Sequence, residues 1–82
     1  MGSVKKALYL IFPQNLIREP MVYRMSKKFD VVFNIRRAKV TDKVGEMVLE
    51  FEGEGENLEK AVTWLKDQGI RVEPVTRDAV EG

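Results

Sequence analysis

The 82-residue sequence contains neither cysteine nor histidine, and each absence restricts its chemistry. Without cysteine, the chain forms no disulfide, holds no iron–sulfur cluster on its own thiolates and has no thiol nucleophile. Without histidine, it lacks the commonest acid–base group at neutral pH and the commonest metal ligand. We therefore expect neither a cofactor nor a metal in this chain, and its residue types alone do not name a function.

The chain also lacks a strong net charge and a long apolar run. Its 14 lysines and arginines nearly balance its 13 acidic residues, giving a net charge of +1. No overall field therefore attracts it to nucleic acid or to acidic membranes. The longest apolar run, Ala7 to Pro13, is far shorter than the ~20 residues of a membrane span. We expect no nucleic-acid partner, no direct membrane insertion and a single small core.

The first part of the sequence predicts a strand followed by a helix. The run Leu8–Phe12 is too short for a helix and is stopped by Pro13, a pattern typical of a buried central strand. A polar turn leads to Pro20, which suits the first turn of a helix because it has no N–H to lose. Apolar residues then recur at helical spacing, at Met21, Val22, Met25 and Phe29.

A second strand, expected from Val31 to Val40, has a break in its alternation at Arg36 and Arg37. The apolar residues on either side of the arginines fall on opposite phases of a regular strand (Phe33 and Ile35, then Ala38 and Val40). A one-residue bulge at the arginine pair would return all four to a single buried face. Two exposed basic residues on an edge strand would produce the same pattern, so both interpretations stay open.

The remaining sequence predicts a hairpin, a helix and a short last strand. Residues 41–45 fit a hairpin connection, and Glu46–Glu52 is the clearest period-two stretch of the chain. A turn over residues 53–57 leads into a helix whose apolar stripe ends before Gly69, the expected residue after its last turn. Pro74 confines the strand that follows to a sheet edge.

The order βαββαβ predicts the fold. With right-handed crossovers it gives an α+β ferredoxin-like sandwich, a four-stranded antiparallel sheet (order 4-1-3-2) with two helices on one face. The second and fourth strands are then edges, and Trp64 is expected at the rim of the core. We expect a single domain over residues 4–76 and a flexible tail or the start of a linker over residues 77–82.

The sheet face away from the helices is predicted to carry an apolar strip at its centre. If the heavier residues of the first strand face the helices, the strip comprises Ala7, Tyr9, Ile11 and Val48. One interpretation is the ordinary exposure of apolar residues in a small domain. The other is a surface for a second copy or a neighbouring domain, formed by Tyr9, Ile11 and Val48.

Several chemistries found on this architecture lack their residues here. RNA recognition needs aromatic residues on the open face of the third strand, where this chain has Val48 and phosphate-repelling glutamates. Asn15 and Arg18 follow the first strand, as in an acylphosphatase-like site, but their loop has no glycine that would admit an anion to the backbone. The glutamates lack the spacing of a calcium loop. We expect no enzyme, and the cross-strand partners expected for the glutamates are Arg36, Arg37 and Lys39.

Several short motifs together carry a family resemblance. They are Leu10-Ile11-Phe12-Pro13, Pro20 opening a helix, Val32-Phe33-Asn34-Ile35, Gly45 and Gly53 around an alternating strand, Ala61-Val62-Thr63-Trp64-Leu65, and Gly69-Ile70-Arg71-Val72-Glu73. Over about residues 7 to 75, in this order and spacing, the sequence resembles the NIL domain, an ACT-like module with the ferredoxin-like topology.

The resemblance implies a function. NIL domains occur at the C-terminus of the ATPase subunit of methionine-import ABC transporters, where they bind methionine and inhibit transport, and also before 4Fe-4S ferredoxin modules. It implies a cytoplasmic, non-catalytic regulatory domain that senses methionine or a related sulfur amino acid as a homodimer. The alternative is an adaptor domain that docks a ferredoxin module, since the ending Val72–Asp78 is more similar to the second group.

The resemblance also implies a ligand site. The first helix N-terminus with Asn15 and Arg18 would hold the ligand carboxylate. Asn34, in the family's Asn-Ile position, has an amide that can donate a hydrogen bond to the ligand carboxylate or accept one from the ligand ammonium group. Met21 and Phe33 would line the slot for the thioether. This site would form where the first loop of one copy meets the second strand of another; alternatively, Asn34 satisfies an edge backbone group and Arg18 is solvated.

Overall fold

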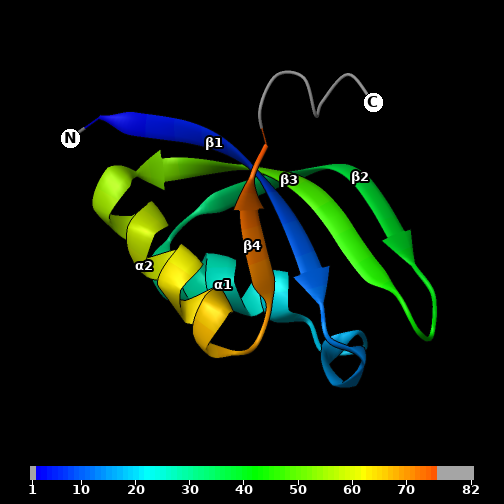
Figure 1. Ribbon diagram of the computed structural model, residues 1–82. Helices are drawn as coiled ribbons and strands as arrows, with labels where there is room; N and C mark the ends of the chain where they lie inside the picture. Colours follow the sequence, from blue (N-terminus) through cyan, green and yellow to red (C-terminus); the bar gives the residue numbers. More distant parts are fainter. Residues whose placement is uncertain (1, 76–82) are drawn as a thin grey trace.

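The computed structural model describes residues 2–75 of the chain (Figure 1). Its elements are β1 (Ser3–Phe12), the 3₁₀ turn η1 (Gln14–Leu16), α1 (Met21–Phe29), β2 (Val32–Val40), β3 (Gly45–Glu54), α2 (Gly55–Asp67) and β4 (Arg71–Pro74). The domain end expected at residue 76 and the tail expected over residues 77–82 lie outside the described residues.

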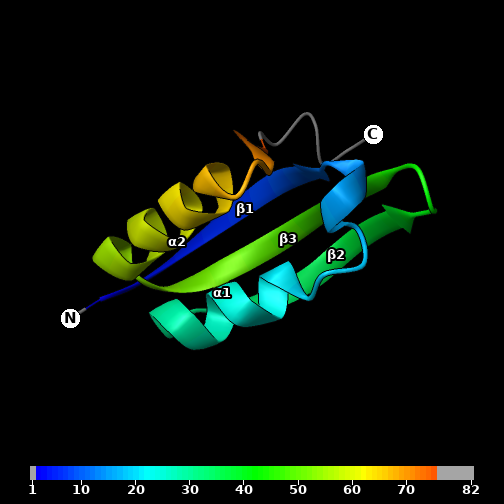
Figure 2. The same cartoon turned by 90° about the horizontal axis from the view of Figure 1, so that it is seen from below.

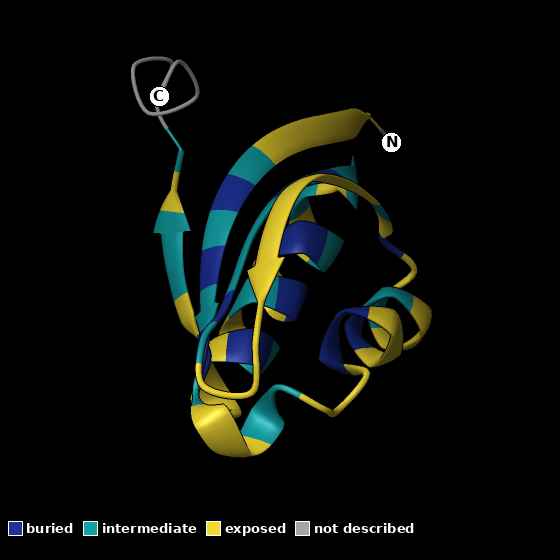
Figure 3. Ribbon diagram, turned by 90° about the vertical axis from the view of Figure 1, so that its right-hand side faces the viewer, coloured by how far each residue is buried: buried dark blue, intermediate teal, exposed yellow. Residues whose placement is uncertain are grey.

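The four strands form one antiparallel sheet in the order β2-β3-β1-β4. Both helices lie across the same face of this sheet, as Figure 2 shows from the helix side. This order is 4-1-3-2 read from the other edge, so the α+β ferredoxin-like fold expected from the sequence is confirmed. The edge strand β2 is exposed over most of its length (Figure 3).

Each helix is followed by a residue in the left-handed backbone conformation, and in both places the residue is of a type that tolerates it. Asp30 follows α1 with φ 57°, a conformation that a short polar side chain tolerates, and the Val31 N–H returns to the Ser26 carbonyl at 3.1 Å. Gly69 follows α2 with φ 97°, as expected for the residue after the last turn. The Ile70 N–H then reaches the Leu65 carbonyl at 3.1 Å, which directs the chain into β4.

Two element boundaries differ from those expected. The strand β1 begins at Ser3 rather than near Leu8, because its first residues pair with the end of β3, Ser3 opposite Glu54. These first residues are exposed, so they are held by backbone pairing and carry no apolar pattern. The helix α2 begins at Gly55, within the segment expected to be a turn.

A bulge at Arg36 brings the two halves of β2 onto one face. Ile35 is opposite Leu49, but the next pair is Arg37 opposite Val48, so Arg36 is an additional residue in the ladder. The structure therefore confirms the bulge at the arginine pair, which brings Phe33, Ile35, Ala38 and Val40 to the helix-facing side of β2. The buried face expected there is not formed, because Phe33 is half-buried and the other three are exposed, Ile35 by 50% and Val40 by 53%.

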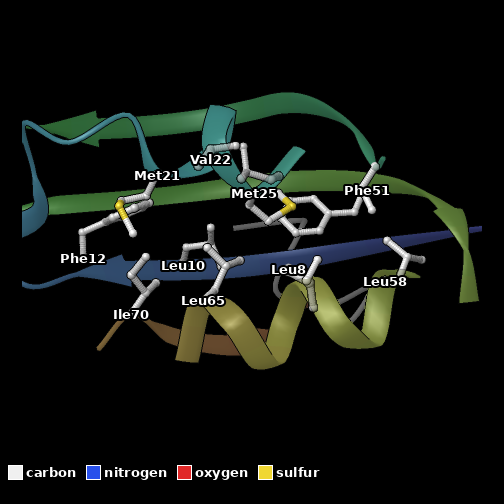
Figure 4. Packing of buried hydrophobic residues seen from close by; sticks show 13 residues of the cluster. Leu8, Leu10, Phe12, Met21, Val22, Met25, Phe51, Leu58, Leu65 and Ile70 are labelled. Carbon is white, nitrogen blue, oxygen red and sulfur yellow. The ribbon is translucent and has the colours of Figure 1, made fainter. Parts of the chain in front are cut away.

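The core lies between the sheet and the two helices (Figure 4). Its residues are buried and apolar: Leu8, Leu10, Phe12, Met21, Val22, Met25, Val31, Leu49, Phe51, Leu58, Ala61, Leu65 and Ile70. Trp64 is half-buried at the rim, as expected, and contacts the Phe29 ring edge-to-face with centroids 6.2 Å apart. The heavier set of β1 residues thus faces the helices.

The bulge predicts that β2 tolerates loss of one arginine. Deleting one residue of the Arg36–Arg37 pair leaves a regular strand with Ile35 and Ala38 on the same faces as before. We expect cooperative unfolding and a loss of stability within about 1 kcal/mol, since only an exposed ion pair is removed. Deleting Val48 from the central strand serves as control and should abolish cooperative unfolding. Urea denaturation followed by circular dichroism measures both; equal damage from the two deletions would refute the bulge.

Candidate functional site

The main hollow of the described chain lies on the sheet face away from the helices. It has a volume of about 580 Å³ and is lined by residues of all four strands and the residue after β4, among them Tyr9, Arg37, Lys39, Glu46, Val48, Glu73 and Val75. This volume falls within the ~300–1,000 Å³ of typical small-molecule pockets. We call this surface the open face and its depression the open-face hollow.

One row of residues crosses the middle of the open face. In the register of the sheet, Arg37 is opposite Val48, Val48 is opposite Tyr9, and Tyr9 is opposite Glu73. Directly opposite residues of antiparallel strands share a face and lie about 4.5–5.5 Å apart. From β2 to β4 the row therefore presents a cation, two largely apolar side chains and a carboxylate.

Tyr9 has an altered acidity because carboxylates surround it. Hydrogen bonding of its hydroxyl to the Glu46 side chain is the largest cause that raises the pKa of Tyr9 above 10.0. Desolvation and the negative charges of Glu46 and Glu73 raise this pKa further, whereas the positive charge of Arg71 lowers it. Glu46 is thereby directed toward the centre of the open face.

The charges around the hollow are only partly paired. Arg36 contacts Glu50 at 3.5 Å, which confirms one of the cross-strand pairs expected from the sequence, and Arg71 contacts Glu73 at 2.8 Å. Within residues 2–75, neither Arg37 nor Lys39 has a carboxylate at ion-pair distance. The cross-strand pairs expected for these two side chains are therefore not formed, and both cations remain available on the rim of the hollow.

A second, smaller groove lies at the corner where β1 leads into α1. Its volume is about 120 Å³, and it is lined largely by apolar residues of the corner, of α1 and of the β2–β3 hairpin. The Gln14 side-chain amide donates to the Asp42 carbonyl at 3.3 Å and so links the corner to this hairpin. Asn15 and Arg18 are exposed here, whereas Met21 is only 3% exposed, belongs to the core and does not line this groove.

The remaining two residues of the expected site point in opposite directions. Phe33 is half-buried on the helix-facing side of β2, and Asn34 is exposed on the open face. Asn34 and Ala7 both lie opposite Glu50 of β3 and are therefore level with each other. Phe12, at the corner, is five residue steps along β1 from Ala7. At ~3.4 Å per residue this separation is ~17 Å, so one chain does not bring Asn34 to Asn15 and Arg18.

The open face carries the surface residues expected from the sequence and several that were not expected. Tyr9, Ile11 and Val48, the expected partner surface, are half-buried and lie on the open face with Ala7. Sequence reasoning did not find Lys39, Glu46 and Glu73 as lining residues of a hollow. The signal that could have found them is the register, which places residues of four strands in common rows.

Two kinds of feature are not found among the described residues. Among residues 2–75, no group of three or more acidic residues is positioned to hold a metal ion. In the same part of the chain, neither helix has the length and apolar character required to cross a membrane. What the open-face hollow does offer is cations, carboxylates, a hydroxyl and apolar surface within one depression.

Comparison with known proteins gives consistent results. The family model of the NIL domain matches residues 6–74. Methionine import ATP-binding protein MetN of Helicobacter hepaticus is 35% identical over 68 residues, which cover 78% of this chain and 19% of that protein. The chain thus spans about a fifth of the length of this relative.

Two solved structures share the fold. The C-terminal domain of an ABC transporter ATP-binding protein from Enterococcus faecalis has a TM-score of 0.76 at 18% identity, covering 88% of this chain and 84% of that one. The de novo designed protein Foldit4 has a TM-score of 0.56 at 10% identity, covering 93% of this chain and 99% of that one.

The environment of Tyr9 makes a testable prediction. In a Tyr23→Phe background, which leaves Tyr9 as the only tyrosine, Glu46→Gln should lower the pKa of Tyr9 toward 10.0, because the negative acceptor is removed. Because the folded pKa is raised, the stabilisation from this hydrogen bond is present below pH 10 and is lost as the pH rises through the folded pKa.

Ultraviolet absorbance across an alkaline titration measures the ionisation of Tyr9. Glu52→Gln removes a carboxylate from the same strand that does not act on Tyr9, and it should leave the titration unchanged. An unchanged titration in Glu46→Gln would show that Glu46 does not accept this hydrogen bond.

Proposed function

Because the chain belongs to the NIL domain family, we propose that it is a non-catalytic regulatory domain that senses methionine or a related sulfur amino acid. The family match covers residues 6–74, nearly all of the described chain, and it confirms the resemblance seen in the sequence. This match is the observation that carries the proposal. The relative from Helicobacter hepaticus, whose name describes methionine import, supports methionine as the ligand to test first.

The open-face hollow is the site we propose for the amino acid. An α-amino acid requires donors for its carboxylate, acceptors for its ammonium and apolar surface for its side chain. Arg37 and Lys39 supply cationic donors, Glu46 and Glu73 supply acceptors, and Val48 supplies apolar surface. Asn34 lies on the same face of β2 but does not line the hollow, and we propose that its amide contacts the ligand from beside it.

The corner groove is a poorer site within one chain. Its volume of about 120 Å³ is well below the ~300 Å³ at which small-molecule pockets usually begin. Met21, expected to line the slot, is held in the core, and Phe33 faces the helices. Asn15 and Arg18 would need a second copy of the chain to complete a site with Asn34, and they are therefore the alternative that the experiment below tests.

The family match and the relative described as a methionine import ATP-binding protein support the regulatory role. The hollow contains groups that bind charge, and the pKa of its tyrosine is raised by Glu46. We propose that this domain acts on a transporter ATPase subunit from the cytoplasmic side, the side on which an imported amino acid accumulates. The adaptor role beside a ferredoxin module is the function that remains if no amino acid binds.

Calorimetry tests the proposed ligand and site together. We expect L-methionine or L-homocysteine to bind the 82-residue chain, and Asn34→Ala to weaken binding by about tenfold, because a hydrogen bond to a charged group is lost. Asn57→Ala, an equivalent change on α2, should leave the affinity unchanged, and both variants should keep the melting temperature of the parent chain. No heat with either amino acid at millimolar concentration would contradict the sensor function.

Arg18→Ala decides between the two locations. If the ligand occupies the open-face hollow, loss of this exposed corner residue should leave the affinity within about twofold of the parent value. A loss as large as that expected for Asn34→Ala would instead place the ligand between the corner of one copy and β2 of another.

A further inference from the structure

The charges of this chain are divided between two parts of the molecule. Residues 14–45, which form α1 and β2, contain eight lysines and arginines but only three acidic residues. Residues 46–75, which form most of β3, α2 and β4, contain eight acidic residues and three basic ones. Figure 2 shows α1 on the β2 side of the sheet and α2 on the β1 side. The molecule therefore has a basic side, formed by α1 and β2, although its net charge is small.

Exposed apolar residues gather on the same basic side. Of the five large apolar residues that are exposed within residues 2–75, four belong to α1 or β2. They are Tyr23, Val32, Ile35 and Val40, with exposed fractions between 50% and 68%. An exposed apolar surface rimmed by charged residues is typical of a site that binds another protein.

The outer edge of β2 is unpaired within the described chain. The strand β3 pairs with one edge of β2, and no strand of residues 2–75 lies along the other. Backbone N–H and C=O groups of alternate residues therefore point away from the sheet, where an extended segment can pair with them. The bulge at Arg36 divides this edge, so an added strand can pair regularly with residues 32–35 or with residues 37–40.

The end of β2, residues 37–40, has different chemistry on its two faces. Arg37 and Lys39 are exposed on the open face, and neither has a carboxylate at ion-pair distance in the described chain. Ala38 and Val40 are exposed on the helix-facing side. Because an added strand continues both faces of the sheet, it needs acidic residues beside the cations and apolar residues on the helix-facing side.

The turn after β2 holds this end of the strand in place. The Thr41 hydroxyl accepts hydrogen bonds from the backbone N–H groups of Lys43 at 3.1 Å and Val44 at 2.9 Å. The Thr41 N–H in turn donates to the Val44 carbonyl at 2.7 Å. An incoming strand therefore meets an edge that is already ordered, which lowers the entropic cost of pairing.

The corner groove lies beside this end of β2 and can take one apolar side chain. Val40 of β2 and Tyr23 of α1 both line it, and most of its other lining residues are apolar. Glu19, its acidic lining residue, is paired with Arg24 at 3.3 Å. The volume of about 120 Å³ is small for a ligand but sufficient for a single anchoring side chain of a partner.

Charge excludes a second copy of β2 as the added strand. Antiparallel pairing of two β2 edges would place Arg37 and Lys39 of both copies on the same face of the joined sheet, where like charges repel. This repulsion acts against self-association and favours a strand that carries carboxylates. A flat anionic membrane is a poorer match, because the cations and the apolar residues of this edge lie on opposite faces of β2.

We infer that residues 37–40 and the corner groove bind an extended segment of another protein in which acidic and apolar residues alternate. The segment adds a fifth strand to the sheet at the edge of β2. Its carboxylates contact Arg37 and Lys39, and one of its apolar side chains occupies the corner groove beside Val40 and Tyr23. Binding of this segment requires no amino acid, so it does not depend on the proposed sensor function.

A synthetic peptide tests this site. The probe is a capped heptapeptide that alternates glutamate with leucine, added to the ¹⁵N-labelled 82-residue chain without an amino-acid ligand. Signals of residues 37–40 and Tyr23 should shift in ¹H–¹⁵N correlation spectra, with a dissociation constant below about 1 mM, and the exposed side of α2 should not respond. A peptide with the same glutamates and leucines in two blocks should bind at least about tenfold more weakly, because it keeps the charge and loses the alternation.

Charge reversal supplies the matched variants. Arg37→Glu combined with Lys39→Glu should weaken binding of the glutamate–leucine peptide at least about tenfold. The same variant should bind a lysine–leucine peptide of equal length, and this gain shows that its edge remains folded. Lys60→Glu combined with Lys66→Glu makes the same change in net charge on α2 and should leave the affinity for the glutamate–leucine peptide within about twofold of the parent value.

Four results would overturn the inference. They are no shifts in the parent chain at about 5 mM peptide, equal affinity for the alternating and block peptides, shifts confined to β1 and β4, and a charge-reversed variant that binds the glutamate–leucine peptide like the parent. Each of them leaves the calorimetric test of methionine binding unaffected, so failure of the docking site and failure of the sensor function are distinguishable.

Discussion

The structure depends on an unequal covering of one sheet. Two helices cover a single face of four antiparallel strands, and the core between them takes the heavier apolar residues. The opposite face keeps Tyr9, Ile11 and Val48 at its centre, and no helix within residues 2–75 covers it. An apolar strip left uncovered in this way is the reason to propose that recognition takes place on the open face.

Much of the fold could be predicted from the sequence, because apolar periodicity reports which face of an element is buried. The alternation along β3 and the helical stripe of α2 gave both elements and their orientation. The first residues of β1 could not be predicted, because they are exposed, carry no apolar pattern and are held by backbone pairing to β3. The bulge at Arg36 was one of two open interpretations, and only the register decides between them.

The candidate site was less predictable than the fold, because it arises from positions distant in sequence. The row that joins Arg37 to Glu73 exists only because the bulge shifts one half of β2 and the sheet aligns four strands. Asn34 was expected to meet Asn15 and Arg18 of a second copy, and within one chain the length of β1 keeps the three residues apart. Many unrelated functions share this topology, so the location proposed for the ligand depends on the side chains of the open face.

The open-face hollow joins the ligand proposal to the fold. A bound amino acid would contact side chains from all four strands there, so its affinity depends on the register of the sheet. The most direct test that this face is the recognition surface is a series of ¹H–¹⁵N correlation spectra recorded as L-methionine is added to the chain. Shifts should concentrate at Tyr9 and Val48, with the exposed side of α2 unchanged; no shifts up to millimolar ligand, or shifts confined to the helices, would contradict the account.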